Sequence, residues 1–380
     1  MANAVTATFD VVVAGLGVMG SAAAHCLAEG GQRVVAFDRF HHPHDRGSSH
    51  GESRIIREAY FEHPVYVPMV QRAYDLWSEL ERRSGTLLYS RTGGVMIGAP
   101  ESALVKGALR SAREHDLAHE VLAAPELRAR FPAFAVPDEM IGVVEARAGV
   151  LFAERCLRAQ LSLAQAAGAE VHANAPVLRW EPRGDGVRVF TAAGAYDARW
   201  LVVCAGAWVG TFFPDLELPF TVERQTVYWF DPAAPSDAFD PRHCPIHLWQ
   251  FDDGQFFYGF PDLGNGVKVA RHHHGVSVAI DQVRREVSAA EIADIRGLVR
   301  RFVPRAEGTL RKSAVCLYTN TPDEHFWIDA HAAHPHVLIV SPCSGHGFKF
   351  APVIGEIVAD WVAERPLRFD VSLFTSRSAR

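Results

Sequence analysis

The sequence predicts an α/β domain that is interrupted by a mostly β domain. Residues 9–38 run through an apolar strand, a glycine-rich turn, an alanine-rich helix and a second apolar strand, which is the order of a βαβ unit. Between about residues 220 and 269 the segments become aromatic and alternating, which is typical of antiparallel strands. After residue 336 the chain again shows an apolar strand, a glycine-rich turn and a helical pattern. We therefore expect the two ends of the chain to form one domain around the inserted one.

The other elements follow from local spacing. Residues 66–83 carry apolar side chains at steps of three and four, which predicts an amphipathic helix. Residues 156–167 have the same spacing and end at Gly168, and residues 200–208 form an apolar strand that ends in small residues. Further expected elements are strands over 187–190 and 337–340 and helices over 289–303 and 353–364.

Composition excludes several classes of protein. The 380 residues are 48% hydrophobic and 22% charged, a globular composition, and the length suggests two domains. The 38 Lys and Arg against 44 Asp and Glu give a net charge of −6 without long blocks of one sign, so a small-molecule partner is favoured over nucleic acid. No apolar run approaches the ~20 residues of a membrane span, and residues 1–9 lack the features of a secretory signal. We expect a cytoplasmic protein with six free cysteines and no zinc site.

The turn Gly15-x-Gly17-x-x-Gly20 follows the first strand and opens the first helix. In that context the glycines permit a tight turn, the approach of a pyrophosphate to backbone N–H groups, and close helix packing. Asp38 closes the second strand, where a carboxylate can accept hydrogen bonds from ribose hydroxyls. The motif predicts an adenine dinucleotide and leaves FAD and NAD open, whereas Asp38 argues against NADP.

Two further segments carry polar residues among glycines. In residues 47–57, Arg54 and Arg57 are three apart; they can neutralise a pyrophosphate and clamp a carboxylate, or they can be solvated surface residues. Residues 344–350 precede an apolar helix, and Lys349 lies between two phenylalanines, which favours an anion-binding role over a surface one. By composition alone Cys316 is a buried thiol, and residues 272–274, three histidines, lack the carboxylates of a metal site.

Together these segments resemble a known family, the monomeric sarcosine oxidase and N-methyltryptophan oxidase group of flavin amine oxidases, which also includes pipecolate oxidases. The matching segments are GLGVMG at 15–20, GSSHGESRIIREAY at 47–60, YGFPDLGNGVK at 258–268, SAVCLYTNTPDEHF at 313–326 and SGHGFKF at 344–350. They lie in order from residue 9 to about residue 374, and the last two are highly specific.

The resemblance implies a fold. It is a discontinuous, glutathione-reductase-like Rossmann-type FAD-binding domain plus an α+β substrate domain with a mostly antiparallel sheet. The FAD-binding domain is expected over residues 1–92, 148–222 and 312–380, and the substrate domain over residues 93–147 and 223–311.

The resemblance also implies a site. FAD is expected to be attached covalently through Cys316. Arg57 and Lys349 are expected to bind the substrate carboxylate, and Lys268 to activate oxygen. Expected to line the pocket or contact the cofactor are His272, Tyr258, Tyr318, Gly15, Gly17, Gly20, Asp38, Ser48, Arg54, Gly345, His346, Gly347 and Lys349.

The implied activity is oxidation of the secondary amine of an N-alkyl amino acid by hydride transfer to flavin, with reoxidation by O₂ to hydrogen peroxide, in a monomer. Oxidation of a cyclic imino acid, or a flavin dehydrogenase with another acceptor, are the alternatives. Substrate identity is open because the chain departs from its relatives at several positions. The departures are Glu58, Ala270, Arg271 and an aromatic patch of Leu248, Trp249 and Phe251.

Overall fold

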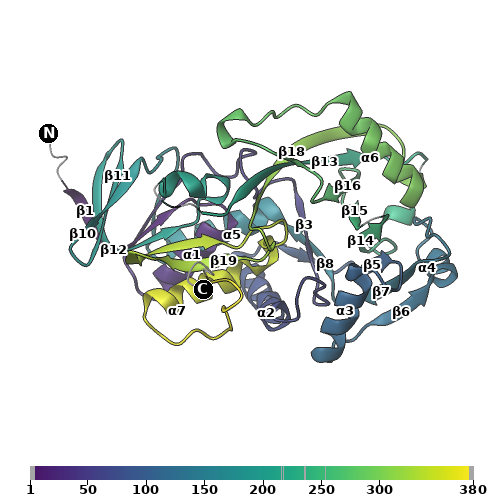
Figure 1. Ribbon diagram of the computed structural model, residues 1–380, viewed down its shortest axis with the longest axis horizontal. Helices are drawn as coiled ribbons and strands as arrows, with labels where there is room; N and C mark the ends of the chain where they lie inside the picture. The colour runs from purple at the N-terminus through teal and green to yellow at the C-terminus, as the bar shows by residue number, and fades with distance from the viewer. Residues whose placement is uncertain (1–4, 215, 217, 235–236, 253, 376–380) are drawn as a thin grey trace.

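The computed structural model describes residues 5–214, 216, 218–234, 237–252 and 254–375. Two large sheets divide these residues into two parts, which lie side by side in Figure 1. The outer ends of the expected FAD-binding domain, at residues 1 and 380, lie outside the described residues.

The first sheet has a parallel centre in the order β20-β12-β1-β2-β9, as the βαβ pattern of the sequence predicts. The first half of β12 pairs with the antiparallel hairpin β10-β11, and its second half pairs with β20. The strands are β1 (Val5–Ala14), β2 (Val34–Phe37), β9 (Glu170–His172), β10 (Arg179–Arg183), β11 (Gly186–Thr191), β12 (Gly194–Val203), β19 (Trp327–His331) and β20 (His334–Ser341).

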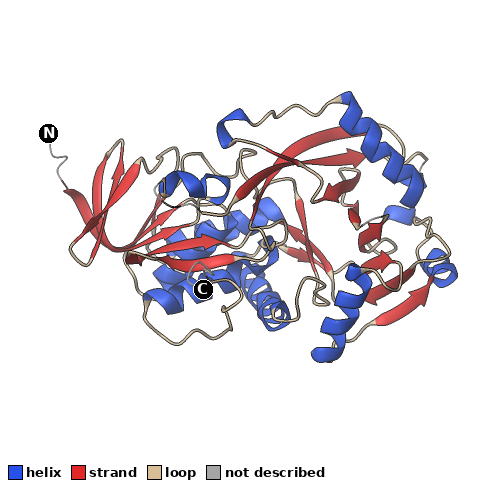
Figure 2. Ribbon diagram, viewed as in Figure 1, coloured by secondary structure: helices blue, strands red, loops and turns tan. Residues whose placement is uncertain are grey.

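Helices cover one face of this sheet (Figure 2). Alternate residues of β1 point to opposite faces: Val11 and Val13 pack in the cluster with the helices, and Val12 and Ala14 in the cluster on the other face. The helices of this part are α1 (Val18–Glu29), α2 (Tyr66–Ser84), α5 (Ala153–Ala166) and α7 (Ala351–Val362). The predicted helix over 66–83 is confirmed as α2, and α7 begins two residues before the predicted start at 353.

The second sheet is antiparallel except where β14 runs parallel to β5. Its strands are β5 (Gly94–Gly98), β6 (Glu120–Ala123), β7 (Ile141–Glu145), β13 (Thr221–Phe230), β14 (Ile246–Phe251), β15 (Gln255–Asp262), β16 (Val267–His272), β17 (Val276–Ser277) and β18 (Leu310–Asn320). Its helices are α3 (Ala103–Glu114), α4 (Ala124–Arg130) and α6 (Ala289–Phe302), the last of which confirms the helix predicted over 289–303. A small sheet of β3 (Ser53–Ile56), β8 (Gly149–Phe152) and β4 (Tyr89–Ser90) lies between the two parts.

We propose that these two parts are the two expected domains. β18 pairs with β13 in the second sheet and leads into β19 and β20 of the first, so it joins the two parts near the proposed boundary at residue 312.

The predicted aromatic patch at 248–251 is only partly correct. Leu248 lines the central cavity, but Trp249 is fully buried against Phe302 of α6, and Phe251 packs in the same cluster. The reason is the alternation of side chains along β14, which sends neighbours to opposite faces.

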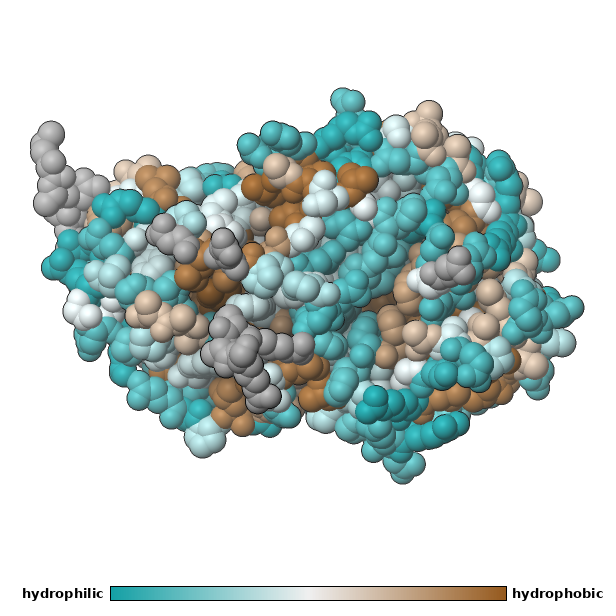
Figure 3. Space-filling model, in the orientation of Figure 1, coloured by the Kyte–Doolittle hydropathy of each residue, from teal (hydrophilic) through white to brown (hydrophobic). Residues whose placement is uncertain are grey.

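On the face shown in Figure 3, hydrophobic side chains form small separate patches between polar ones. Among the described residues, no helix has both the length and the apolar character needed to cross a bilayer.

Candidate active site

A continuous cavity begins where the parallel strands β1, β2, β12 and β20 end. The loops that follow the carboxyl ends of parallel strands meet at one sheet edge, where ligands of such folds bind. From there the cavity reaches β15, β16 and β18 of the second sheet. All the predicted site residues line it except Gly20 and Lys268.

The glycine turn at the end of β1 leaves no room for larger side chains. Gly15 has φ +93°, and a Cβ there would lie 2.5 Å from the Cys204 carbonyl oxygen. A Cβ on Gly20 would lie 1.8 Å from the Gly15 oxygen, so only a glycine at position 20 lets the first turn of α1 pack this closely against Gly15. The turn therefore holds the start of α1 at the cavity, where backbone N–H groups favour an anion.

Asp38 follows β2 and is buried beside this turn. Its carboxylate accepts the Leu16 and Phe40 amides at 2.7 and 2.8 Å, and His42 Nε2 lies 2.7 Å from its Oδ2. Burial opposes ionisation, but His42 and the two amides outweigh it and lower the Asp38 pKa. Asp38 is thus held as a carboxylate, the form that accepts hydrogen bonds from ribose hydroxyls.

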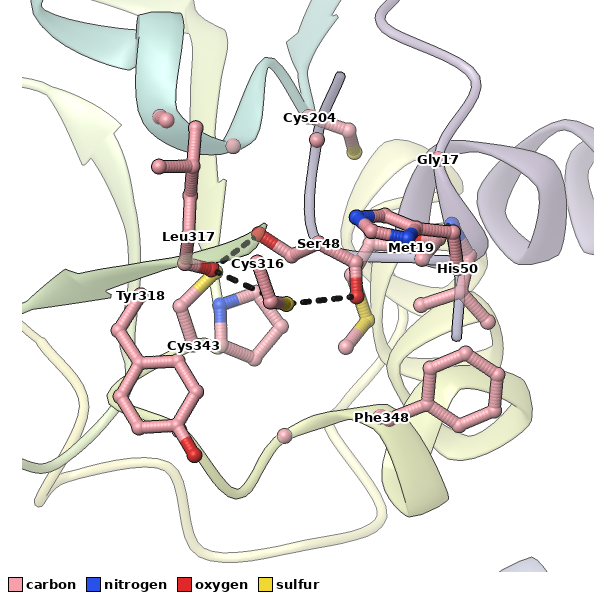
Figure 4. Close-up of a pocket in the computed structure, with 18 of the residues that line it drawn as sticks. Gly17, Met19, Ser48, His50, Cys204, Cys316, Leu317, Tyr318, Cys343 and Phe348 are labelled. Carbon is pink, nitrogen blue, oxygen red and sulfur yellow. Dashed lines mark hydrogen bonds between the residues drawn. The ribbon is translucent and has the colours of Figure 1, made fainter. Parts of the chain in front are cut away.

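Cys316 lies on β18 at the centre of the cavity, opposite Gln225 of β13 in the strand register (Figure 4). Its Sγ is 3.8 Å from Arg54 Nη2 and 3.9 Å from the Ser48 carbonyl oxygen. The Ser48 hydroxyl donates to the Leu317 carbonyl at 2.5 Å, and this bond fixes the loop before β3 to β18. All six cysteines are free thiols, as predicted, and Cys204 and Cys343 also line the cavity.

Arg54 lies on β3 and is held by carbonyl groups of the loop before it. Its guanidinium donates to the Ser48, His50 and Ser53 carbonyl oxygens at 2.7, 2.6 and 2.8 Å. No carboxylate within ion-pair distance neutralises it among the described residues. A fixed positive charge therefore lies beside Cys316 in the cavity wall.

At the other end of the cavity two cations are buried together. Arg57 follows β3, and its Nη2 donates to both carboxylate oxygens of Glu62 at 2.8 Å. Lys349 donates to the Tyr60 hydroxyl at 3.2 Å and to the His346 carbonyl at 2.7 Å. Burial and the nearby Arg57 charge lower the Lys349 pKa to about 7. This end can bind a carboxylate, provided that it competes with Glu62 for Arg57.

Rings close this end of the cavity from the second sheet. His272 Nδ1 lies 3.0 Å from the Tyr318 hydroxyl, and Tyr258 of β15 is adjacent in the wall. The pair packs against the turn after β20, where a Cβ on Gly345, at φ +78°, would lie 2.5 Å from the Tyr318 ring. Burial raises the Tyr258 pKa to about 12, so both phenols stay neutral near pH 7.

His346 is held from both sides. Nε2 lies 3.0 Å from the Glu324 carbonyl, to which it can only donate, so Nδ1 accepts from the Tyr60 hydroxyl at 2.6 Å. Burial lowers its pKa to about 3, which keeps the ring neutral. The ring also stacks on Phe326. His346 therefore orients Tyr60, the residue that accepts from Lys349.

Lys268 lies on β16, and its ammonium does not line the cavity. Nζ donates to the Gly51 carbonyl, the Ser53 carbonyl and the Ser53 hydroxyl at 2.7, 2.9 and 3.2 Å. Burial and the Arg54 charge lower its pKa well below the usual value. Lys268 is thus a buried amine that donates to residues 51–53, next to the carbonyl groups that hold Arg54.

Several polar residues at the site were not predicted, and Glu62, Tyr60 and His42 have the most evident roles. Glu62 and Tyr60 lie in the loop after Arg57, and only their short distance from it in sequence signals them. His42 follows Asp38 by four residues. Asp38, His42 and His44 form a group whose potential metal-ligand atoms all lie within 4.8 Å of one another. Because Asp38 is already bonded to two amides in the dinucleotide-type turn, we assign the group no metal.

The chain is similar to known proteins over nearly all of its length. The family described as FAD dependent oxidoreductase matches residues 10–361. The chain is 46% identical over 374 residues to a monomeric sarcosine oxidase of Streptomyces avermitilis, covering 97% of each protein. It is 36% identical over 368 residues to an N-methyl-L-tryptophan oxidase of Salmonella arizonae, covering 96% of this chain and 98% of that one.

Solved structures share the fold at lower identity. Glycine oxidase from Geobacillus kaustophilus superposes with a TM-score of 0.82 at 20% identity, over 98% of this chain and all of that one. An amino acid oxidase essential for nikkomycin biosynthesis superposes with a TM-score of 0.86 at 24% identity, over 99% of each chain. These likenesses show that the chain shares their fold.

Proposed function

The chain belongs to the FAD dependent oxidoreductase family, and on that premise we propose that it oxidises the secondary amine of an N-alkyl amino acid with O₂ as the acceptor. The observation that carries the proposal is the pair of buried cations, Arg57 and Lys349, at the far end of a cavity that starts at the Gly15 turn. A substrate carboxylate at this pair would leave its amine toward the middle of the cavity. The relatives named for sarcosine and N-methyltryptophan support this substrate class.

The cavity residues fit FAD. The glycine turn and the start of α1 would hold the pyrophosphate, and Asp38 the ribose hydroxyls. Cys316 would hold the flavin covalently: a thioether at its Sγ would replace the thiol hydrogen and one methyl hydrogen of the flavin, and O₂ would be the final oxidant. The Arg54 guanidinium places a positive charge beside this sulfur, 3.8 Å from Nη2 to Sγ.

When bound, FAD supplies the hydride acceptor and passes the electrons to O₂. The residues of the chain orient the substrate for that transfer. Arg57 would bind the carboxylate through two N–H groups and Lys349 as a point charge, and this fixes one end of the substrate. Tyr258, Tyr318 and His272 would exclude water around the other end.

The same two cations determine the protonation of the amine. Positive charge near an ammonium lowers its pKa, so Arg57 and Lys349 favour the neutral amine, which is the form that can lose a hydride. Burial keeps both phenols protonated and lowers the pKa of both pocket histidines, so each of the four is a poor acceptor for the ammonium proton. We therefore assign no side-chain base, and a pH profile of flavin reduction that required a separate enzyme base would contradict this assignment.

Lys268 would act in the second half of the reaction. Electron transfer to O₂ builds negative charge, which a preorganised cation in a dry site stabilises. Three hydrogen bonds to residues 51–53 fix the Lys268 nitrogen, and among the described residues no carboxylate lies within ion-pair distance of it.

A substrate panel tests the proposal. Sarcosine, N-methyltryptophan, pipecolate and proline are each supplied under air, and hydrogen peroxide is measured. Sarcosine amide, which keeps the secondary amine but lacks the carboxylate, is the matched control and should be a poor substrate. Peroxide from pipecolate or proline alone would indicate a cyclic imino-acid oxidase. Flavin reduction without peroxide would indicate a dehydrogenase with another acceptor.

A further inference from the structure

We propose that Glu145 is a positioning residue that holds Arg57 ready for a carboxylate ligand by fixing the backbone of residues 58 and 59. The inference rests on the proposed function, because it concerns the same carboxylate site. It assigns a role in ligand binding to a side chain that does not line the cavity.

Glu145 is the last residue of β7 in the second sheet, and it is 1% exposed. Each of its carboxylate oxygens accepts one backbone N–H of the loop after β3: Oε1 that of Glu58 at 2.6 Å, and Oε2 that of Ala59 at 2.8 Å. The carboxylate thus connects the second sheet to the loop that carries Arg57.

The connection reaches the guanidinium within one residue. Arg57 precedes the two clamped amides, and its Nη1 donates to the Ala59 carbonyl at 2.9 Å. Its guanidinium also lies 4.4 and 4.8 Å from the ring centres of Tyr60 and Phe61. By holding the backbone of residues 58 and 59, Glu145 therefore fixes the chain from which the Arg57 side chain extends. It also fixes the residue whose carbonyl group accepts from Arg57 Nη1.

A carboxylate is suited to this task, because two adjacent N–H donors need two acceptors and an amide side chain offers one. Burial opposes the charge and raises the Glu145 pKa to about 7. Among the described residues, no Lys, Arg or His side chain lies within ion-pair distance of it. Its hydrogen-bond partners are therefore the two backbone amides, and the buried carboxylate stabilises the loop.

The neighbouring Glu58 provides a matched control. Its side chain lies in the same loop but pairs with Arg147 at 2.6 Å, and within the described part of the chain no hydrogen bond joins it to Arg57 or to the clamped amides. Replacing Glu58 by Gln changes a buried carboxylate at the same place without removing an acceptor from residues 58 and 59.

The test measures ligand binding to the flavin-loaded enzyme. Propionate, a carboxylate without an amine, is titrated and its Kd is read from the flavin absorbance. Glu145→Gln should raise the Kd about tenfold, the usual effect of disturbing a charge-assisted hydrogen bond. The limiting rate of flavin reduction at saturating sarcosine should stay within about twofold, because Glu145 does not touch the reacting atoms. Glu58→Gln should leave the Kd within about twofold.

A double variant separates positioning from general damage. If Glu145 acts through Arg57, adding Glu145→Gln to Arg57→Ala should change the Kd by less than about twofold. Independent, additive effects would overturn the inference, and so would an unchanged Kd in Glu145→Gln alone. If Glu145→Gln does not fold, Glu145→Asp, which keeps the charge but is too short to reach both amides, serves in the same comparison. An unchanged Kd in Arg57→Ala would overturn the proposed function, and the inference with it.

Discussion

Arg57 and Glu62 form a buried ion pair in which Nη2 of the arginine lies 2.8 Å from each carboxylate oxygen. Glu62 thereby occupies the guanidinium that we assign to the substrate carboxylate. Burial opposes ionisation of Glu62, but the Arg57 and Lys349 charges outweigh it and lower the Glu62 pKa. A substrate must compete with this internal carboxylate for Arg57.

Replacing Glu62 by Gln should therefore tighten ligand binding and weaken the fold. The competing charge is gone, so the Kd of propionate should fall by about tenfold. The free protein should lose about 3 kcal/mol of stability, since Arg57 is left as a buried, unpaired charge. Titration and thermal unfolding, each with and without propionate, check both effects, and propionate should restore much of the lost Tm. Glu101→Gln, at an exposed pair with Lys106, is the control; weaker propionate binding in Glu62→Gln would contradict the competition.

The pH dependence of ligand binding should follow Lys349. Its pKa is about 7, so it is charged below pH 7 and loses its charge as the pH rises. Propionate binding should therefore weaken between pH 6 and 8.5. The facing groups do not titrate there: Arg57 and Tyr60 have raised pKa values, Glu62 a lowered one, and His346 one of about 3.

Lys349→Met provides the check on that assignment. The variant should bind propionate at least ~10-fold more weakly at pH 6, because one charge-assisted partner is lost. Its Kd should be flat with pH or should fall slightly, since Glu145 gains charge in the same window and strengthens its hold on the loop. A Kd that still rises with pH in Lys349→Met would assign the titration to another group.

Much of the fold was predictable because its signals are local. The turn at 15–20 and helix α2 were recognisable from spacing within about twenty residues. The site was less accessible to such reasoning. Arg54 and Cys316 are 262 positions apart in sequence. They lie close together because β18 packs against the segment of residues 48–54. By spacing alone Arg57 was indistinguishable from a surface arginine, and the family resemblance raised it to a site residue.

What sequence could not show was the set of partners within the site. The ion pair of Glu62 with Arg57 depends on how one loop folds back over five residues. The placement of Trp249 outside the cavity depends on the face that β14 turns toward α6, which a one-residue shift in register would have reversed. Such facts belong to packing, which composition and spacing do not encode.

Covalent attachment of flavin can be tested against a matched thiol in the same cavity. Acid-denatured wild-type protein should keep its yellow colour on the chain, and Cys316→Ser should release it. Cys343→Ser removes another thiol that lines the cavity and should leave the flavin attached. Flavin should still bind noncovalently to Cys316→Ser, because the glycine turn and Asp38 are unchanged. Quantitative release of flavin from the wild type would refute attachment.

The oxygen reaction should depend on Lys268 and not on the second ammonium beside it. Lys268 and Lys312 both lie over the Trp229 ring, at 5.3 and 4.5 Å from its centre, but Lys312 is half-exposed and paired with Glu52. Lys268 is buried, and its hydrogen-bond partners in the described part of the chain are uncharged oxygens, so a charge on it acts in a dry site. Lys268→Met should slow reoxidation of the reduced flavin by ~100-fold or more, the scale of losing one preorganised stabiliser. Anaerobic reduction by the amine should stay within about tenfold of the wild-type rate.

Stopped-flow measurement of the two half-reactions separates these effects, and Lys312→Met should leave both rates close to the wild type. Equal reoxidation rates in Lys268→Met and the wild type would move the role to Arg54, the other fixed charge on the same loop.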